Sequence, residues 1–180
     1  MIGGPDFASE LAAIRPWADV APAITHAERL ARMDRARALT AAAGADALLV
    51  NAGQSLRYFA GLPWGSTERM VVLLLPVTGD PVMICPRFEL GSLEADMAIE
   101  TQMALWEEED SPFALAAKVL GTGKTLAADP MLPFHWAEKL RASGLKLVDA
   151  TPVIDGCRAI KSPAELALMQ QAKNMTLAVH

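Results

Sequence analysis

The sequence predicts an α/β domain built on a mixed β-sheet of about five to six strands, with helices on both faces of the sheet. Two strand-like apolar runs are joined by a short turn rich in Pro, Gly and Asp, which is typical of an antiparallel hairpin. Two later runs alternate with helical segments, which indicates a parallel part of the sheet. The predicted strands are Ala47–Val50, Met70–Leu75, Val82–Cys85, Thr125–Ala128 and Leu145–Val148.

The composition fits one globular domain. A chain of 180 residues with 52% hydrophobic composition can bury one substantial core. Its 21 acids and 16 bases are spread along the chain, and the resulting charge of −5 argues against a nucleic-acid partner. The longest apolar run, Met70–Leu75, is far shorter than the about 20 residues that a membrane-spanning helix requires. No signal-peptide pattern is present, and Cys85 and Cys157 lack metal-type spacing, so we expect a cytoplasmic, reduced protein with no membrane segment.

The N-terminal third begins without regular structure. Residues 1–24 are rich in Pro, Gly and Ala without a sustained period, so a flexible leader or arm is expected there. The first helix begins at Thr25, which has capping-box spacing to Glu28, and it ends at Gly44. The first strand follows, and a polar turn then leads to a short helical segment around Leu56–Phe59.

Helices and strands alternate in the second half. Ser111 and Pro112 begin a helix that ends at Leu120, and another helix covers Pro133–Ser143 between the last two strands. We therefore assign residues 25–160 to one α/β domain.

A last helix begins with a second capping box. Ser162 and Glu165 have the required spacing, and Pro163 occupies the first helical position. Apolar residues still recur up to His180 without a Gly or Asn stop signal. We expect this helix to continue in a longer protein, with residues 161–180 as the start of a further domain.

The segment Gly121–Thr125 invites a phosphate-loop interpretation, and a nucleotide-dependent enzyme is one alternative function. A phosphate loop needs a glycine where Lys118 stands, and it needs the order strand, loop, helix. The order here is helix, turn, strand. A Gly-capped helix end that leads into a strand is therefore favoured.

No self-contained active site is predicted. The histidines, His26, His135 and His180, have no paired spacing, and no nucleophile motif is present. The acidic run Glu107–Asp110 is interpreted as a solvated loop before a helix. We assign no catalytic residue, no metal ligand and no cofactor to this chain.

The segment from Tyr58 to Arg69 combines aromatic residues, glycines and an ionic pair between two core elements. Trp64 could form the wall of a pocket, and Arg69 could bind a carboxylate through its planar guanidinium. The structural alternatives are packing or a subunit contact for Trp64, and an ion pair with Glu68 or another surface acid for Arg69. Tyr58, Trp64 and Arg69 are the candidate substrate-binding or interface residues.

Two stretches, DALLVNAGQSLRYFAGLPWGSTERMVVLLLP and DGCRAIKSPAELALMQQAKNM, resemble the N-terminal domain of the creatinase, prolidase and aminopeptidase P family. The first matches the family's order of strand, polar turn, aromatic residue before a glycine, variable loop, arginine and hydrophobic hairpin. The second contains R-x-I-K-S-P-A-E, which in that family links the N-terminal domain to the first helix of the catalytic domain. The similarity covers residues 25–180.

The resemblance implies a domain that precedes a "pita-bread" catalytic domain, in which two Asp, one His and two Glu beyond His180 hold two divalent metal ions (Mn, Co or Zn). The chain alone would then be inactive, and the parent would be a metallopeptidase that hydrolyses proline-containing (Xaa-Pro) peptides with a metal-bridged water. The N-terminal domain would contact its own C-terminal catalytic domain, form a homodimer, and close over the partner's active site.

The resemblance also places Arg69 where creatinases carry an arginine that reaches the substrate carboxylate. Two residues earlier, the aromatic partner of creatinases is replaced by Thr67, which argues against creatine and favours Xaa-Pro peptides. Two further functions stay open: a creatinase-like amidinohydrolase as the parent, and a stand-alone small-molecule or protein binding module of the same fold.

Overall fold

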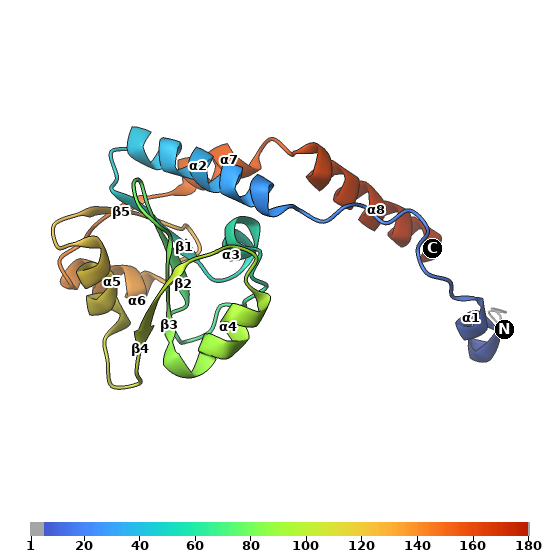
Figure 1. Ribbon diagram of the computed structural model, residues 1–180, viewed down its shortest axis with the longest axis horizontal. Helices are drawn as coiled ribbons and strands as arrows, with labels where there is room; N and C mark the ends of the chain where they lie inside the picture. The colour runs from blue at the N-terminus through green and yellow to red at the C-terminus, as the bar shows by residue number, and fades with distance from the viewer. Residues whose placement is uncertain (1–5, 180) are drawn as a thin grey trace. The chain divides into compact units, whose positions relative to one another are not determined.

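The structure is a computed structural model that describes residues 6–179 (Figure 1). The chain divides into two compact units. One is Thr25–Ile160, and the other joins the residues up to Ile24 with those from Lys161 onward. The elements in chain order are α1 (Phe7–Ala13), α2 (His26–Ala42), β1 (Ala47–Asn51), α3 (Gln54–Ala60), β2 (Val72–Pro76), β3 (Val82–Pro86), the 3-10 helix η1 (Arg87–Glu89), α4 (Leu90–Asp96), β4 (Gln102–Trp106), α5 (Pro112–Leu120), β5 (Thr125–Ala128), α6 (Phe134–Ala142), β6 (Lys146–Asp149), α7 (Thr151–Arg158) and α8 (Pro163–Val179).

The Thr25–Ile160 unit contains a six-stranded sheet in the order β4-β3-β2-β1-β5-β6. β2 is antiparallel to β1 and β3, whereas the other neighbouring pairs are parallel. The predicted mixed sheet, its hairpin and its parallel part are confirmed. The edge strand β4 was not predicted, because it begins with exposed Gln102 and its partly covered side chains lack the uniform apolar pattern of the central strands.

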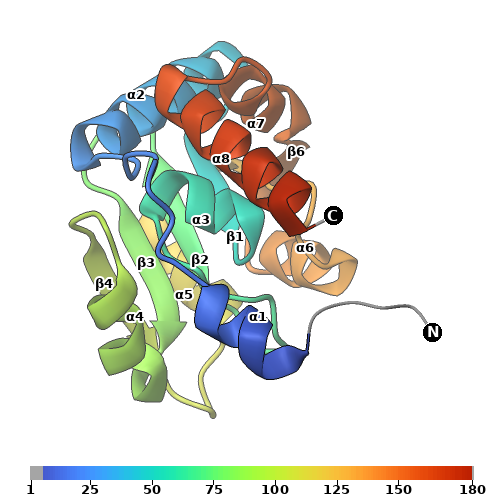
Figure 2. The same cartoon turned by 90° about the vertical axis from the view of Figure 1, so that its right-hand side faces the viewer.

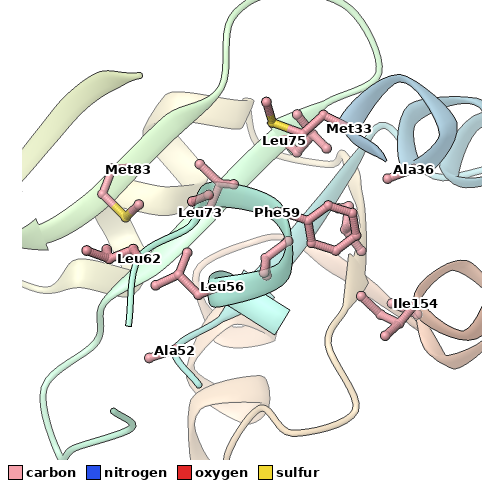
Figure 3. Close-up of a cluster of buried hydrophobic side chains, with 14 of the residues drawn as sticks. Met33, Ala36, Ala52, Leu56, Phe59, Leu62, Leu73, Leu75, Met83 and Ile154 are labelled. Atoms are coloured by element: carbon pink, nitrogen blue, oxygen red, sulfur yellow. The ribbon is translucent and has the colours of Figure 1, made fainter. Parts of the chain in front are cut away.

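Helices cover both faces of the sheet, which explains why β1 is buried along its whole length. Its side chains alternate between two core clusters, with Leu48 and Val50 in the first and Ala47 and Leu49 in the second. Helices α2, α3 and α7 supply the first cluster, and α5 and α6 supply the second (Figure 1, Figure 2). Figure 3 shows fully buried Phe59 of α3 within the first cluster.

Helix α3 is fixed at its carboxyl end by α2. Arg29 and Arg32 donate hydrogen bonds to carbonyl oxygens in the last turn of α3, including that of Tyr58, which lies 2.9 Å from Arg32 Nη1. The carbonyl oxygens of a helix's last turn carry partial negative charge, which favours the positive charge of the two arginines. Gly61 ends the helix with φ +76°, and a Cβ at this position would lie only 2.6 Å from Ala98 Cβ. These contacts fix the direction in which the chain leaves α3.

The second unit contains α1 and α8. The expected arm at residues 1–24 includes the short helix α1, whose cap Asp6 accepts hydrogen bonds from two backbone N–H groups of the first turn, at 3.0 and 3.1 Å. Residues 1–5 and His180 lie outside the described residues. Helix α8 begins with the predicted capping box between Ser162 and Glu165. Within residues 6–179, no helix is long and apolar enough to span a membrane.

Candidate functional site

Polar side chains gather at one edge of the sheet, which we call the carboxyl-end edge. The strand directions place the carboxyl ends of β1, β3, β4, β5 and β6 at this edge, together with the amino end of β2. Ligands of open α/β sheets bind outside the carboxyl ends of the strands. Arg69 precedes β2, Arg87 and Phe88 follow β3, and Glu107 and Glu108 follow β4. Arg69 therefore meets residues that are distant in sequence.

Arg69 is held by two carboxylates. Its Nε lies 2.8 Å from Glu108 Oε1, and its Nη1 lies 2.7 Å from Glu68 Oε1. The guanidinium carbon lies 5.3 Å from the ring centre of Phe88. The hydrogen bond to Glu108 raises the pKa of Arg69 above its ordinary value. Because these side chains are partly or largely exposed, solvent screens both ion pairs, and a competing carboxylate can displace them.

The surroundings of Arg69 are acidic. Burial raises the pKa of the Glu89 carboxyl, while the nearby charge of Arg69 acts in the opposite direction. Arg87 and Glu107, which follow β3 and β4, form a further ion pair at the carboxyl-end edge. The acidic run that was interpreted as a solvated loop is exposed, but two of its carboxylates bind arginines of the same edge. The sequence did not reveal these pairings, because their partners follow different strands.

A cleft of about 670 Å³ opens beside Arg69. An aromatic pair contributes to its lining, with the ring centres of Phe113 and Trp136 6.4 Å apart and Lys139 Nζ 5.2 Å from the centre of the Phe113 ring. Among the described residues, Arg69 is the one predicted site residue in this lining. The lining residues are Glu68, Arg69, Met70, Trp106, Glu108, Glu109, Asp110, Ser111, Pro112, Phe113, His135, Trp136, Lys139, Ala142 and Ser143.

Tyr58 connects three helices. It lies on α3, and its hydroxyl donates a hydrogen bond of 2.9 Å to the carbonyl oxygen of Cys157 on α7. The guanidinium carbon of Arg32, on α2, lies 4.1 Å from the centre of the Tyr58 ring. These contacts give Tyr58 a packing role, and its role in substrate binding stays a prediction.

Trp64 and Arg69 lie in different surroundings. Trp64 is partly buried and packs against the first core cluster. Arg69 lines the cleft of about 670 Å³ together with Phe113 and Trp136 of the second cluster. The structure therefore does not bring Trp64 and Arg69 together, and the packing alternative for Trp64 agrees with its contacts. The binding role of Arg69 stays a prediction.

Two buried polar residues of this edge were not singled out from the sequence. Asn51 ends β1, Asp129 follows β5, and they are 1% and 2% exposed. Asp129 accepts hydrogen bonds from the backbone N–H of Asn51 at 3.2 Å and of Met131 at 2.9 Å. Asn51 Nδ2 donates to the Met131 carbonyl at 3.0 Å. The available signal was a polar residue at the end of each of two apolar strands.

The residues that the structure describes form neither a metal centre nor a phosphate loop. Among residues 6–179, no group of three or more His, Cys, Asp or Glu side chains is placed to hold a metal ion. These residues therefore do not fit the two-metal centre that the resemblance implies. At the Gly121–Thr125 turn, Lys124 Nζ binds Asp46 Oδ1 at 2.8 Å, and the Gly123 N–H donates to the Gly144 carbonyl at 2.8 Å. The order is helix, turn, strand, as predicted, and no phosphate loop is formed.

Comparison with known proteins finds relatives of the same fold and assigns the chain to a family. Residues 32–160 match the family model described as Creatinase/Prolidase N-terminal domain. The probable dipeptidase PepE of Mycobacterium tuberculosis is 33% identical over 145 residues, which cover 78% of this chain and 39% of PepE. The chain thus spans about 40% of the length of such relatives.

Solved structures agree with this match. The crystal structure of dipeptidase PepE from Mycobacterium ulcerans is similar with a TM-score of 0.73 and 31% identity, over 81% of this chain and 40% of PepE. The creatinase/prolidase N-terminal domain of an X-Pro dipeptidase from Streptococcus pyogenes shares the fold with a TM-score of 0.61 and 21% identity, over 70% of this chain and 98% of that domain. The family match, the PepE relatives and the six-stranded mixed sheet together lead to one assignment: this chain belongs to the creatinase/prolidase N-terminal domain family.

Proposed function

We propose that this chain is the non-catalytic N-terminal domain of a Xaa-Pro peptidase, and that it controls substrate access to an active site on a catalytic domain outside these 180 residues. The observation that carries the proposal is the match of residues 32–160 to the Creatinase/Prolidase N-terminal domain. Similar proteins described as dipeptidases or prolidases are longer than this chain. The catalytic domain would be the chain's first partner.

Within this proposal, Arg69 binds the free carboxylate of the peptide. Its ion pairs with Glu68 and Glu108 are solvent-exposed, so a substrate carboxylate can take the place of one of them. Phe88 is 63% exposed beside the guanidinium and offers an aromatic face to the prolyl ring.

The whole protein is further proposed to be a cytoplasmic homodimer that depends on two divalent metal ions. The metal ions would be held by the catalytic domain, outside this chain. Exposed large apolar residues at the carboxyl-end edge, Met131 and Phe134, are 75% and 79% exposed and support a subunit contact there.

A creatinase-like amidinohydrolase is the second candidate, and one contact favours it. Creatinases pair the substrate-binding arginine with an aromatic residue, and the sequence has Thr67 at that position. In the structure Phe88, in the 3-10 helix η1 that follows β3, supplies an aromatic ring beside Arg69. The presence of Thr67 in place of the aromatic residue therefore does not by itself distinguish creatine from a Xaa-Pro peptide as the substrate.

The test uses the full-length protein with Arg69→Ala and Arg69→Lys. Removing a charge-assisted hydrogen bond to the carboxylate should raise KM for the dipeptide Ala-Pro about tenfold or more, because such bonds contribute about 1.5–3 kcal/mol. Ala-Pro-amide, which lacks the carboxylate, should be affected much less. Arg87→Ala is the matched control, since Arg87 is an ion-paired arginine of the same edge.

Equal losses for the two substrates would contradict carboxylate binding by Arg69. Hydrolysis of creatine in place of Ala-Pro by the unmodified protein would move the assignment to the second candidate.

A further inference from the structure

A second hollow at the carboxyl-end edge lies at the topological switch point of the sheet. From β1 the chain passes to α3, which packs in the first core cluster, whereas β5 leads to α6, which packs in the second. The connections from these two neighbouring parallel strands thus diverge to opposite faces. Such a divergence is where open α/β sheets form a ligand crevice.

The crevice is present, and apolar atoms make up most of its exposed lining. It has a volume of about 470 Å³, and we call it the switch-point pocket. Asn51, Gln54, Ser55 and Ser66 supply amide and hydroxyl groups, Arg158 supplies a guanidinium, and exposed Met131 supplies an apolar wall. The pocket lies entirely within the Thr25–Ile160 unit.

Asn51 contributes a fixed hydrogen-bond acceptor to this pocket. The side chain is 1% exposed, and its Oδ1 has no hydrogen-bond partner among the described residues. The amide cannot rotate by 180° at low cost, because Nδ2 donates to the Met131 carbonyl at 3.0 Å, and rotation would set Oδ1 against that carbonyl oxygen. Asp129 holds the backbone on both sides of this contact through the N–H groups of Asn51 and Met131. A buried acceptor without a donor costs stability, so it indicates a ligand group.

We propose that the switch-point pocket binds a peptide backbone amide, whose N–H donates to Asn51 Oδ1. The acceptor is a neutral carboxamide oxygen, which suits a neutral N–H donor. The same lining contains the amide, hydroxyl and guanidinium groups of Gln54, Ser55, Ser66 and Arg158, which suit the carbonyl oxygens of a peptide. The exposed side chain of Met131 adds apolar contact to the neighbouring residue of the peptide. The choice of a peptide as the ligand rests on the proposed function, whereas the amide-binding geometry does not.

The probes are acetyl-proline methylamide, which has a single N–H, and acetyl-proline methyl ester, which has none. We expect the methylamide to cause saturable chemical-shift changes in a ¹H–¹⁵N spectrum of the chain, centred on the backbone amides of Asn51, Gly53 and Met131. The methyl ester should bind about tenfold more weakly, because one hydrogen bond to a buried acceptor is lost.

Three variants make the test specific. Asn51→Ala removes the acceptor and should weaken methylamide binding about tenfold. Ser66→Trp fills the pocket from its exposed side without touching the buried hydrogen bonds, so it should abolish binding even if Asn51→Ala does not fold. Thr40→Val is the matched control, because Thr40 Oγ1 is also buried without a partner but lies on α2, outside the pocket lining.

The absence of shifts at Asn51, Gly53 and Met131, or equal binding of methylamide and ester, would overturn the inference. Methylamide binding by the chain combined with an inactive full-length protein would support the amide-binding pocket and contradict the proposed peptidase function. Peptidase activity of the full-length protein without methylamide binding by the chain would support the peptidase function and contradict the amide-binding pocket.

Discussion

The substitution Gly61→Ala tests whether the carboxyl end of α3 is held as tightly as the structure indicates. Gly61 has φ +76°, and an added Cβ would lie 2.6 Å from Ala98 Cβ and 2.8 Å from the guanidinium carbon of Arg29. The Arg29 guanidinium can move, but Ala98 Cβ cannot move without its backbone. Gly44 is the matched control, since it has φ +72° and an added Cβ there would have no atom within 4 Å.

The expected magnitudes follow from two terms. A left-handed conformation costs an L-residue about 1–2 kcal/mol, and the lower entropy of the unfolded chain offsets about 0.4–1 kcal/mol of it, so Gly44→Ala should lose about 1 kcal/mol. Overpacking adds about 1–3 kcal/mol at Gly61, which gives a loss of about 2–4 kcal/mol. Urea unfolding of the two variants and the unmodified chain measures both values. A Gly61→Ala loss no larger than that of Gly44→Ala would refute the close packing of Gly61 against Ala98.

Three further predictions concern hydrogen bonds and thiols. Tyr58→Phe removes the hydroxyl that donates to the Cys157 carbonyl and should cost about 1 kcal/mol in urea unfolding; an unchanged midpoint would show that this bond does not stabilise the fold. Hydrogen bonding from Lys124 lowers the pKa of Asp46 below its ordinary value, so Asp46 stabilises the fold above the pKa of about 3.9 of the unfolded chain, and this contribution disappears as the pH falls through the lower folded-state pKa. The stability difference between Asp46→Asn and the unmodified chain should therefore shrink on acidification below about pH 4, and a difference that grows would contradict this sign. Burial raises the pKa of Cys85 to about 12 and also raises that of Cys157, so a thiol reagent at about pH 8 should label both residues only after unfolding, and rapid labelling of the folded chain would show them accessible.

Local patterns were sufficient to predict most of the sheet. The central strands are covered on both faces, so their sequences are uniformly apolar and easily distinguished. Caps at Thr25, Ser111 and Ser162 gave three helix starts, because each oxygen bonds a backbone N–H within three residues. Strand β4 and helices α4 and α7 are not predicted from the sequence, since β4 is a partly exposed edge and both helices lack a side-chain cap.

The site was less predictable because its contacts are made across strands. Arg69 could be recognised as a candidate, but its partners Phe88 and Glu108 follow β3 and β4, and only the strand order brings them together. Trp64 is close to Arg69 in the sequence, but Trp64 packs against the first core cluster, whereas Arg69 lines the cleft beside Phe113 and Trp136. The unpaired oxygen of Asn51 has no sequence signature at all, because it depends on the orientation fixed by Met131.

The most direct test of the proposed function is the hydrolysis of Ala-Pro by the full-length protein and by the chain of 180 residues, each assayed with added Mn²⁺, Co²⁺ or Zn²⁺. We predict metal-dependent release of proline by the full-length protein and none by the chain alone. Hydrolysis by the chain itself, or a full-length protein that is inactive with every metal, would contradict the assignment of a non-catalytic domain to a Xaa-Pro peptidase.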